Sequence, residues 1–409
     1  DRVAVQTRGA TWTYRELGSH VDAVGEQLEL LPPRAPVAVR CDGSIESVAR
    51  LLAVMLSRHP AVPIDNVLPT ERIGAMITAV GAVSPFAPED HRPAAAAIWE
   101  QLPPDCAVIA FTSGSTGEPK AVLQPHSLWF NQIDELADEL GIGPGHRACQ
   151  ALPISYGAGL DVTLTALMTG ATLALPDPRT DGVATTLRAL TRWAPDSLHL
   201  TPALWRTLCA ATQAPQALRS IGTIATCGEA VHVADVAEAR TLLPSATFVN
   251  RSGSSETGNL AFNVFPPSRP LPSSLVPAGR PARHKAIVIV DDSGTPLPAG
   301  EIGHLEVTSP HIAVGYLVDG RVHRFAETAG GRRTILGDRG RLTGGDLHLL
   351  GRTDDTIKVR GYRVDTGEIT AAARSVDGIV DAFVDIRDVA GTACVAAYLV
   401  AASGHRPPS

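Results

Sequence analysis

The sequence lacks the features on which several large protein classes depend. Its 409 residues carry a formal net charge of −7 and no long basic run, which argues against nucleic acid or an anionic membrane as the main partner. No apolar run approaches the length of a membrane span, and the N-terminus has no signal peptide. We therefore expect a globular, cytoplasmic protein.

Cysteine and histidine also lack the spacing of a metal site. The six cysteines lie far apart without a CxxC pair, and none of the thirteen histidines belongs to an HExxH segment. We interpret the cysteines as buried thiols in a reducing compartment and expect no structural metal.

Short apolar runs alternate with stretches of helical period over most of the chain. Strands are predicted at 35–41, 171–176, 197–202, 221–228 and 247–253, most of them followed by a helical stretch. This alternation predicts an α/β fold with doubly wound, mainly parallel sheets over residues 1–353. Within it, turn-rich alternating strands predict a small β subdomain at about 280–350. A partial α+β C-terminal domain is expected at 354–409.

One polar loop raises a question of function. The segment "AFTSGSTGEPKAV" (110–122) follows an apolar run with small hydroxylated residues, two glycines and Lys120. Backbone N–H groups of such a loop can converge on an anion. It is neither a Walker loop, which requires GxxxxGK[ST], nor a GxSxG nucleophile elbow. Taken alone, a loop of this composition is more often a solvated turn than a functional site.

Further segments in the same order decide between these interpretations. The loop resembles the phosphate loop of the adenylate-forming superfamily, and "TWTYREL" (11–17) and "LSRHPAVPID" (56–65) resemble that family's first signatures. Four more segments match later motifs: "CGEAV" (227–231), "GSSETG" (253–258), "LGDRGRL" (336–342) and "GRTDDTIKVRGYRV" (351–364). The chain is most similar to adenylation domains of nonribosomal peptide synthetases.

The resemblance implies activation of a carboxylic acid by ATP, with Mg²⁺, and transfer to the phosphopantetheine thiol of a carrier protein. It implies catalytic roles for Lys120, His126, Ser255 and Glu256, with Glu256 also the metal ligand. The residues implied in binding ATP are Thr112, Ser113, Gly114, Ser115, Thr116, Gly117, Gly228, Glu229, Ser252, Asp338 and Arg352. Asp354 matches the hinge about which the C-terminal domain rotates between the two half-reactions.

Three positions depart from the family pattern. Ser252 stands where an aromatic residue ordinarily stacks on adenine, and Gly157 stands where an aspartate pairs with the α-ammonium of an amino acid. Because a buried ammonium without an anion is costly, we expect an acid other than a conventional α-amino acid. The family's late C-terminal lysine has no counterpart after Tyr398, which we attribute to truncation rather than to natural loss.

The substrate pocket follows from the same ungapped comparison. Its predicted residues are Tyr156, Gly157, Ala158, Asp161, Ala203, Ala225, Cys227, Arg251, Asn259 and Leu260. Arginine is rarely buried unless paired, so Arg251 either pairs with Asp161 or binds an acidic or carbonyl group of the substrate. Two further functions stay open: an acyl- or aryl-CoA ligase, and a catalytically inactive relative.

Overall fold

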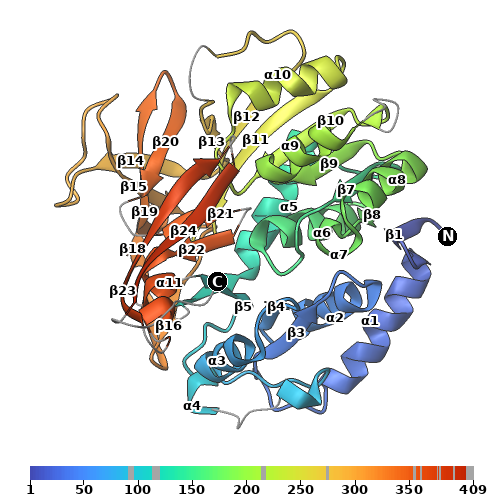
Figure 1. The fold of residues 1–409 in the computed structure, drawn as a ribbon. Coiled ribbons are helices and arrows are strands. Elements are labelled where there is room, and N and C mark those ends of the chain that lie inside the picture. Colours follow the sequence, from blue (N-terminus) through green and yellow to red (C-terminus); the bar gives the residue numbers. More distant parts are fainter. Residues whose placement is uncertain are drawn as a thin grey trace.

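The computed structural model describes residues 1–90, 96–112, 120–212, 218–272, 276–352, 356–359, 362–374, 376, 379–389 and 392–401. Three larger sheets and two hairpins organise these residues (Figure 1). No helix among them is long and apolar enough to cross a membrane.

The largest sheet has nine strands in the order β13-β12-β11-β10-β9-β7-β8-β1-β2. They are β1 (Val3–Thr7), β2 (Thr11–Thr13), β7 (Arg147–Gln150), β8 (Thr172–Leu175), β9 (Ser197–Leu200), β10 (Thr223–Cys227), β11 (Thr247–Ser254), β12 (Gly258–Phe265) and β13 (Arg280–Pro281). The pairs from β11 through β1 are all parallel. Helices α6 (Gly157–Met168), α7 (Pro178–Asp181), α8 (Val183–Trp193), α9 (Pro202–Ala211) and α10 (Val233–Leu242) connect successive strands. The predicted strand–helix alternation is therefore confirmed.

A second sheet has six strands in the order β17-β16-β6-β5-β4-β3. They are β3 (Val37–Cys41), β4 (Ala61–Asp65), β5 (Cys106–Thr112), β6 (Lys120–Pro125), β16 (Gly315–Val318) and β17 (Arg321–Arg324). The helical segments of this region are α1 (Tyr14–Leu28), α2 (Ile45–Leu56), α3 (Thr70–Val80), the 3-10 turn η1 (Pro88–Asp90), α4 (Ala96–Trp99) and α5 (His126–Leu140). Strands β3, β4 and β5 are parallel, whereas β5, β6, β16 and β17 are antiparallel.

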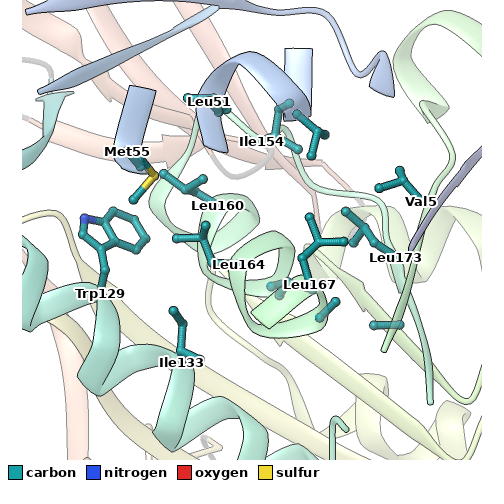
Figure 2. Packing of buried hydrophobic residues seen from close by; sticks show 14 of the residues in the cluster. Val5, Leu51, Met55, Trp129, Ile133, Ile154, Leu160, Leu164, Leu167 and Leu173 are labelled. Atoms are coloured by element: carbon teal, nitrogen blue, oxygen red, sulfur yellow. The ribbon is translucent and has the colours of Figure 1, made fainter. Parts of the chain in front are cut away.

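The main core lies where α2, α5 and α6 pack together against strands of both sheets. Figure 2 shows Leu160 and Leu164 of α6 facing Met55 of α2 and Trp129 of α5, while Leu167 lies toward Leu173 of β8. All six belong to one buried apolar cluster that also includes residues of β1, β3 and β8. Because α6 is fixed on its apolar side in this way, its polar residues are held in place against the nine-stranded sheet.

The third sheet corresponds to the predicted β subdomain, with one difference. Its strands are β14 (Ala286–Val290), β15 (Gly303–Ser309), β18 (Ala326–Thr328), β19 (Gly331–Thr343) and β20 (Asp346–Arg352). Strands β16 and β17 fall inside the predicted range of 280–350, yet they belong to the second sheet, where β16 pairs with β6 and β17 pairs with β16. The segment 315–324 therefore belongs to the sheet that carries the phosphate-like loop.

The C-terminal part contains more strand than the sequence indicated. Helix α11 (Thr366–Arg374) and strand β24 (Thr392–Ala401) agree with the α+β character expected of this part. Between them lies the unpredicted strand β23 (Ile379–Val389), which pairs with β24, while β21 (Thr356–Val359) pairs with β22 (Tyr362–Asp365). The domain boundary at 353/354 and the hinge residue Asp354 lie outside the described residues, so both stay predictions.

Candidate functional site

The site lies at the carboxyl ends of the central strands. Strand β7 pairs with β8 on one side and with β9 on the other, so the chain reverses its direction of winding there. Ligands of open α/β sheets bind at the carboxyl ends beside such a switch point. The predicted pocket residues follow these ends: α6 comes after β7, and α9 comes after β9.

The phosphate-like loop joins two adjacent strands. Its last residue before the turn, Thr112 of β5, is the register partner of Lys120 of β6. Residues 113–119, which include Ser113, Gly114, Ser115, Thr116 and Gly117, lie outside the described residues. Within the described part, Oγ1 of Thr112 is buried and has no hydrogen-bond partner. The structure therefore brings the two ends of the loop together.

Glu256 is tied to the sheet that carries this loop. Its side chain is buried, and its Oε1 accepts a hydrogen bond of 3.2 Å from the hydroxyl of Tyr316 in β16. Its carbonyl accepts a 2.9 Å bond from the backbone N–H of Ala313. The preceding carbonyl, of Ser255, accepts a 2.8 Å bond from Nε2 of Gln124 in β6. The predicted metal ligand and the predicted phosphate loop are thus connected through β6 and β16.

The two residues predicted to bind ribose face each other across a strand pair. Asp338 of β19 is the register partner of Arg352 of β20. The sequence placed them in separate motifs, and the antiparallel pairing brings their backbones together. Asp338 is half-buried.

Other predicted ATP residues have local structural roles. Oε2 of Glu229 accepts a 3.0 Å bond from the backbone N–H of Ala203 in the first turn of α9, a position that favours a carboxylate. Gly228, which directly precedes Glu229, has a φ of +91°, a backbone conformation that glycine adopts readily. His126 begins α5 and its ring stacks on Phe130, while Ser252 is half-buried in β11. The catalytic role of His126 and the roles of the others in binding ATP stay predictions.

Arg251 and Asp161 form a buried ion pair. Nη2 of Arg251 in β11 donates a 2.5 Å hydrogen bond to Oδ2 of Asp161 in α6, and the side chains are 3% and 2% exposed. The internal pair was one of the two alternatives for Arg251, and the structure contains it. Burial raises the pKa of Asp161 to about 6, against the lowering effect of the arginine.

Other predicted pocket residues lie around this pair. Cys227 of β10 is the register partner of Arg251, so both side chains lie on the face of the sheet that α6 covers. Ala225 lies on the same face two residues earlier. Gly157 is the exposed first residue of α6, flanked by the half-buried Tyr156 and Ala158.

Two predicted pocket residues on β12 have other contacts. Nδ2 of Asn259 donates a 3.3 Å bond to Oε2 of Glu135 in α5. Leu260 packs in the apolar cluster of the β subdomain, with Ile289 and Leu305. These are structural contacts, and a pocket role for either residue stays a prediction.

The residues present fit a magnesium–nucleotide complex better than a bare metal ion. Among the described residues no group of three or more His, Cys, Asp or Glu could hold a metal. Protein-bound Mg²⁺ commonly takes one or two carboxylates together with the phosphates of its substrate. The buried carboxylate of Glu256 suits that arrangement, as does the hydroxyl of Thr112, which has no hydrogen-bond partner among the described residues.

Sequence reasoning missed Tyr316 and Gln124. Neither lies in one of the family-like motifs, and each acts through a partner more than fifty residues away. The only sequence signal is the short apolar run around Tyr316, which predicts a strand but not its neighbour.

Comparison with known proteins agrees with this geometry. The family model of AMP-binding enzymes matches residues 1–103 and 84–317. The chain belongs to this family. Chondramide synthase CmdD from Chondromyces crocatus is 29% identical over 92% of the chain, which spans 10% of that synthase. Eight curated relatives with 26–30% identity are all longer, and the chain spans 5–12% of their lengths.

Solved structures of this family have the same fold. The amide bond synthetase McbA from Marinactinospora thermotolerans superposes with a TM-score of 0.84 at 25% identity, covering 99% of this chain and 88% of McbA. The holo form of PA1221, a nonribosomal peptide synthetase protein with adenylation and PCP domains, gives 0.81 at 25% identity and covers 99% of this chain and 75% of its own. The predicted fold and the resemblance to adenylation domains are confirmed.

Proposed function

We propose that this AMP-binding enzyme activates a carboxylic acid and passes it to the phosphopantetheine thiol of a carrier protein. In the first step a carboxylate oxygen attacks the α-phosphorus of ATP, the bond to the β-phosphate oxygen breaks, and pyrophosphate leaves. In the second step the thiol sulfur attacks the acyl carbon, the bond to the phosphate oxygen breaks, and AMP leaves as the thiol loses its proton.

One observation carries the proposal. The bond from Gln124 to the carbonyl of Ser255 joins the strand that begins at Lys120 to the segment that contains Glu256. A cation and a carboxylate fixed on connected elements suit a reaction in which two anions meet, because electrostatic stabilisation is then the largest catalytic contribution.

Each residue has a defined part in this proposal. Lys120 and the hydroxyl of Thr112 hold the leaving pyrophosphate, and Glu256 holds Mg²⁺, which neutralises phosphate charge when bound. Asp338 and Arg352 orient the ribose. The six cysteines are free thiols, which favours a reducing, cytoplasmic compartment.

The acid is proposed to lack a conventional α-ammonium group, because glycine stands at position 157 and offers no anion. The curated relatives include nonribosomal peptide synthetases, and PA1221 combines adenylation and PCP domains, which supports a carrier protein as the acceptor. CoA as acceptor is the second candidate, supported by a structural neighbour that is an o-succinylbenzoate CoA synthetase, 22% identical.

Pyrophosphate release tests the proposal. The protein in its natural polypeptide is assayed with ATP, Mg²⁺ and a panel that pairs amino acids with their keto, hydroxy and aryl counterparts. We expect release with acids that lack the α-amino group, and its loss in Lys120→Ala and Glu256→Gln. Silence across the panel, with ATP binding intact, would instead favour an inactive relative. Addition of a holo carrier protein or CoA to the active reaction then identifies the acceptor.

A further inference from the structure

The buried ion pair between Arg251 and Asp161 has polar atoms that nothing in the described part of the chain satisfies. Only one hydrogen bond joins the two groups, although a guanidinium and a carboxylate commonly form two. Nε and Nη1 of Arg251 and Oδ1 of Asp161 are buried and have no hydrogen-bond partner among the described residues. Native proteins pair most buried polar groups with hydrogen-bond partners. Three such atoms on one ion pair therefore indicate that a group of a bound ligand supplies the missing hydrogen bonds.

The position of the pair indicates what kind of occupant this is. Asp161 lies one helical turn after Gly157 on α6, and Arg251 lies on the strand that leads to Glu256. Both therefore adjoin the segments that bind the acid and the nucleotide in the proposed function. The pair also lies at the carboxyl end of β10, because Cys227, the last residue of that strand, is the register partner of Arg251. Ligands of open α/β sheets bind at such strand ends.

The charges of the pair limit the chemistry of that acid. Each of the two ions is already neutralised by the other at a distance of 2.5 Å. A substrate ammonium would meet the positive charge of Arg251, and a second carboxylate would meet the negative charge of Asp161. The unpaired atoms comprise donors on Arg251 and an acceptor on Asp161. A neutral group that both accepts and donates satisfies them without adding a buried charge.

We propose that the acid activated by this enzyme carries a second, neutral polar group, a hydroxyl or a carboxamide, which accepts a hydrogen bond from Arg251 and donates one to Asp161. This inference rests on the proposed function and names the class of its substrate. Arg251 and Asp161 are then specificity-determining residues.

Binding of unreactive adenylate analogues tests this independently of turnover. Acyl-sulfamoyl adenosines are prepared in matched sets whose acyl chains differ only in one substituent: hydroxyl, carboxamide, methyl, ammonium or carboxylate. Calorimetry measures their affinity for the unaltered protein and for the double variant Asp161→Leu/Arg251→Leu. Replacing both partners avoids leaving one buried charge unpaired.

We expect the unaltered protein to bind the hydroxyl or carboxamide analogue at least about tenfold more tightly than its methyl counterpart, since the latter leaves the buried groups unpaired. The double variant should lose or reverse this preference. The control variant Arg40→Leu/Asp90→Leu removes another arginine–aspartate pair, whose hydrogen bonds of 2.6 and 2.7 Å start from a strand of the second sheet. This control should keep the preference for the hydroxyl or carboxamide analogue.

The remaining outcomes separate the two claims. Equal affinity for the methyl analogue, or a preference for the ammonium or carboxylate analogue, overturns the inference and leaves the proposed function standing. Binding of none of the analogues by protein whose thermal unfolding is cooperative overturns the proposed function and the inference with it. An unchanged preference in the double variant shows that other residues select the substrate, which also overturns the inference.

Discussion

The hydroxyl of Tyr316 holds the carboxylate of Glu256 through a 3.2 Å hydrogen bond between residues sixty positions apart. The ring of Tyr316 is fixed in turn by an edge-on contact with Phe325, with ring centroids 5.2 Å apart. A carboxylate oriented in this way loses little freedom when it binds a cation. Groups that orient metal ligands typically change metal affinity by about 10–100-fold when they are removed.

We therefore expect Tyr316→Phe to raise the Mg²⁺ concentration needed for half-maximal pyrophosphate release about tenfold. The same shift should appear when Mn²⁺ binding in the presence of ATP is followed by electron paramagnetic resonance, which needs no turnover. Because the variant keeps the ring, its thermal stability should change little. An unaltered metal dependence would mean that other contacts fix Glu256.

Gly157 and Gly159 form a matched pair for testing the amino-acid anchor. A Cβ added at Gly157 meets nothing within 4 Å, so Gly157→Asp should fold normally. It would supply the missing anion, and we expect pyrophosphate release with small α-amino acids that the unaltered protein rejects. Activation of no amino acid by a folded Gly157→Asp variant would contradict the alignment of the pocket.

The control substitution, at Gly159 two residues later, should instead destabilise the protein. A Cβ at Gly159 would lie 2.1 Å from the carbonyl oxygen of Pro153, too close for any real contact. Gly159→Ala must therefore move α6 away from the segment that precedes it. We expect a loss of about 3 kcal/mol or more in the free energy of unfolding, measured by chemical denaturation.

Tyr14 provides a stability test outside the site. Its hydroxyl donates to the carbonyl of Leu167 in the last turn of α6, at 3.1 Å, and to that of Ala171 just after the helix, at 2.6 Å. Burial raises the pKa of Tyr14 to about 12, so the hydroxyl stays protonated at neutral pH. Tyr14→Phe should lower the free energy of unfolding by about 1–3 kcal/mol, because buried carbonyls lose their donor. Its Mg²⁺ dependence should match that of the unaltered protein, in contrast to Tyr316→Phe.

Buried thiols predict how stability changes in alkali. Burial raises the pKa of Cys106 from 9.0 to about 12, so between these values the unfolded chain releases a proton that the folded chain keeps. The stabilisation is complete below pH 9 and is lost as pH rises toward 12, by up to about 1.4 kcal/mol per pH unit. The pKa values of Cys41, Cys149 and Cys209 are raised in the same direction.

Denaturation at a series of pH values checks this slope. Cys106→Ala should show a shallower decline above pH 9 than the unaltered protein, by the contribution of one thiol. A slope that is the same in both proteins would show that Cys106 ionises equally in the folded and unfolded chains.

Cys394, which is half-buried on β24, should react first with a thiol reagent, because the other five cysteines are buried.

The sequence was sufficient for features that depend on neighbours in the chain. The apolar run before Cys41 and the helical period after it define β3 and α2, since burial of one face is a local pattern. It was insufficient where a strand could join either of two sheets. The segment 315–324 alternates like its neighbours in the β subdomain, yet it joins the second sheet through the pairing of β16 with β6, and only the folded chain decides that choice.

The residues of the candidate site also divide into those that the sequence predicted and those that only the folded chain reveals. Motif order predicted Glu256, Asp338 and Arg352 one at a time, and the folded chain supplied the pairing of Asp338 with Arg352. Comparison with the family raised the Arg251–Asp161 pair as one of two alternatives, because both align with pocket positions. The donors to Glu256 and Ser255 could not be found in this way, since Tyr316 and Gln124 have no chemistry that distinguishes them from core residues.

The ion pair of Arg251 and Asp161 also sets a rule for redesigning the enzyme. Its two members come from α6 and β11, ninety residues apart. A transplanted segment that includes only one of them therefore leaves an unpaired charge in the interior. Breaking a buried pair on one side costs about 3–5 kcal/mol, a large part of the stability of an ordinary domain. Segment exchange with a relative must therefore move both elements together, or replace both charges at once.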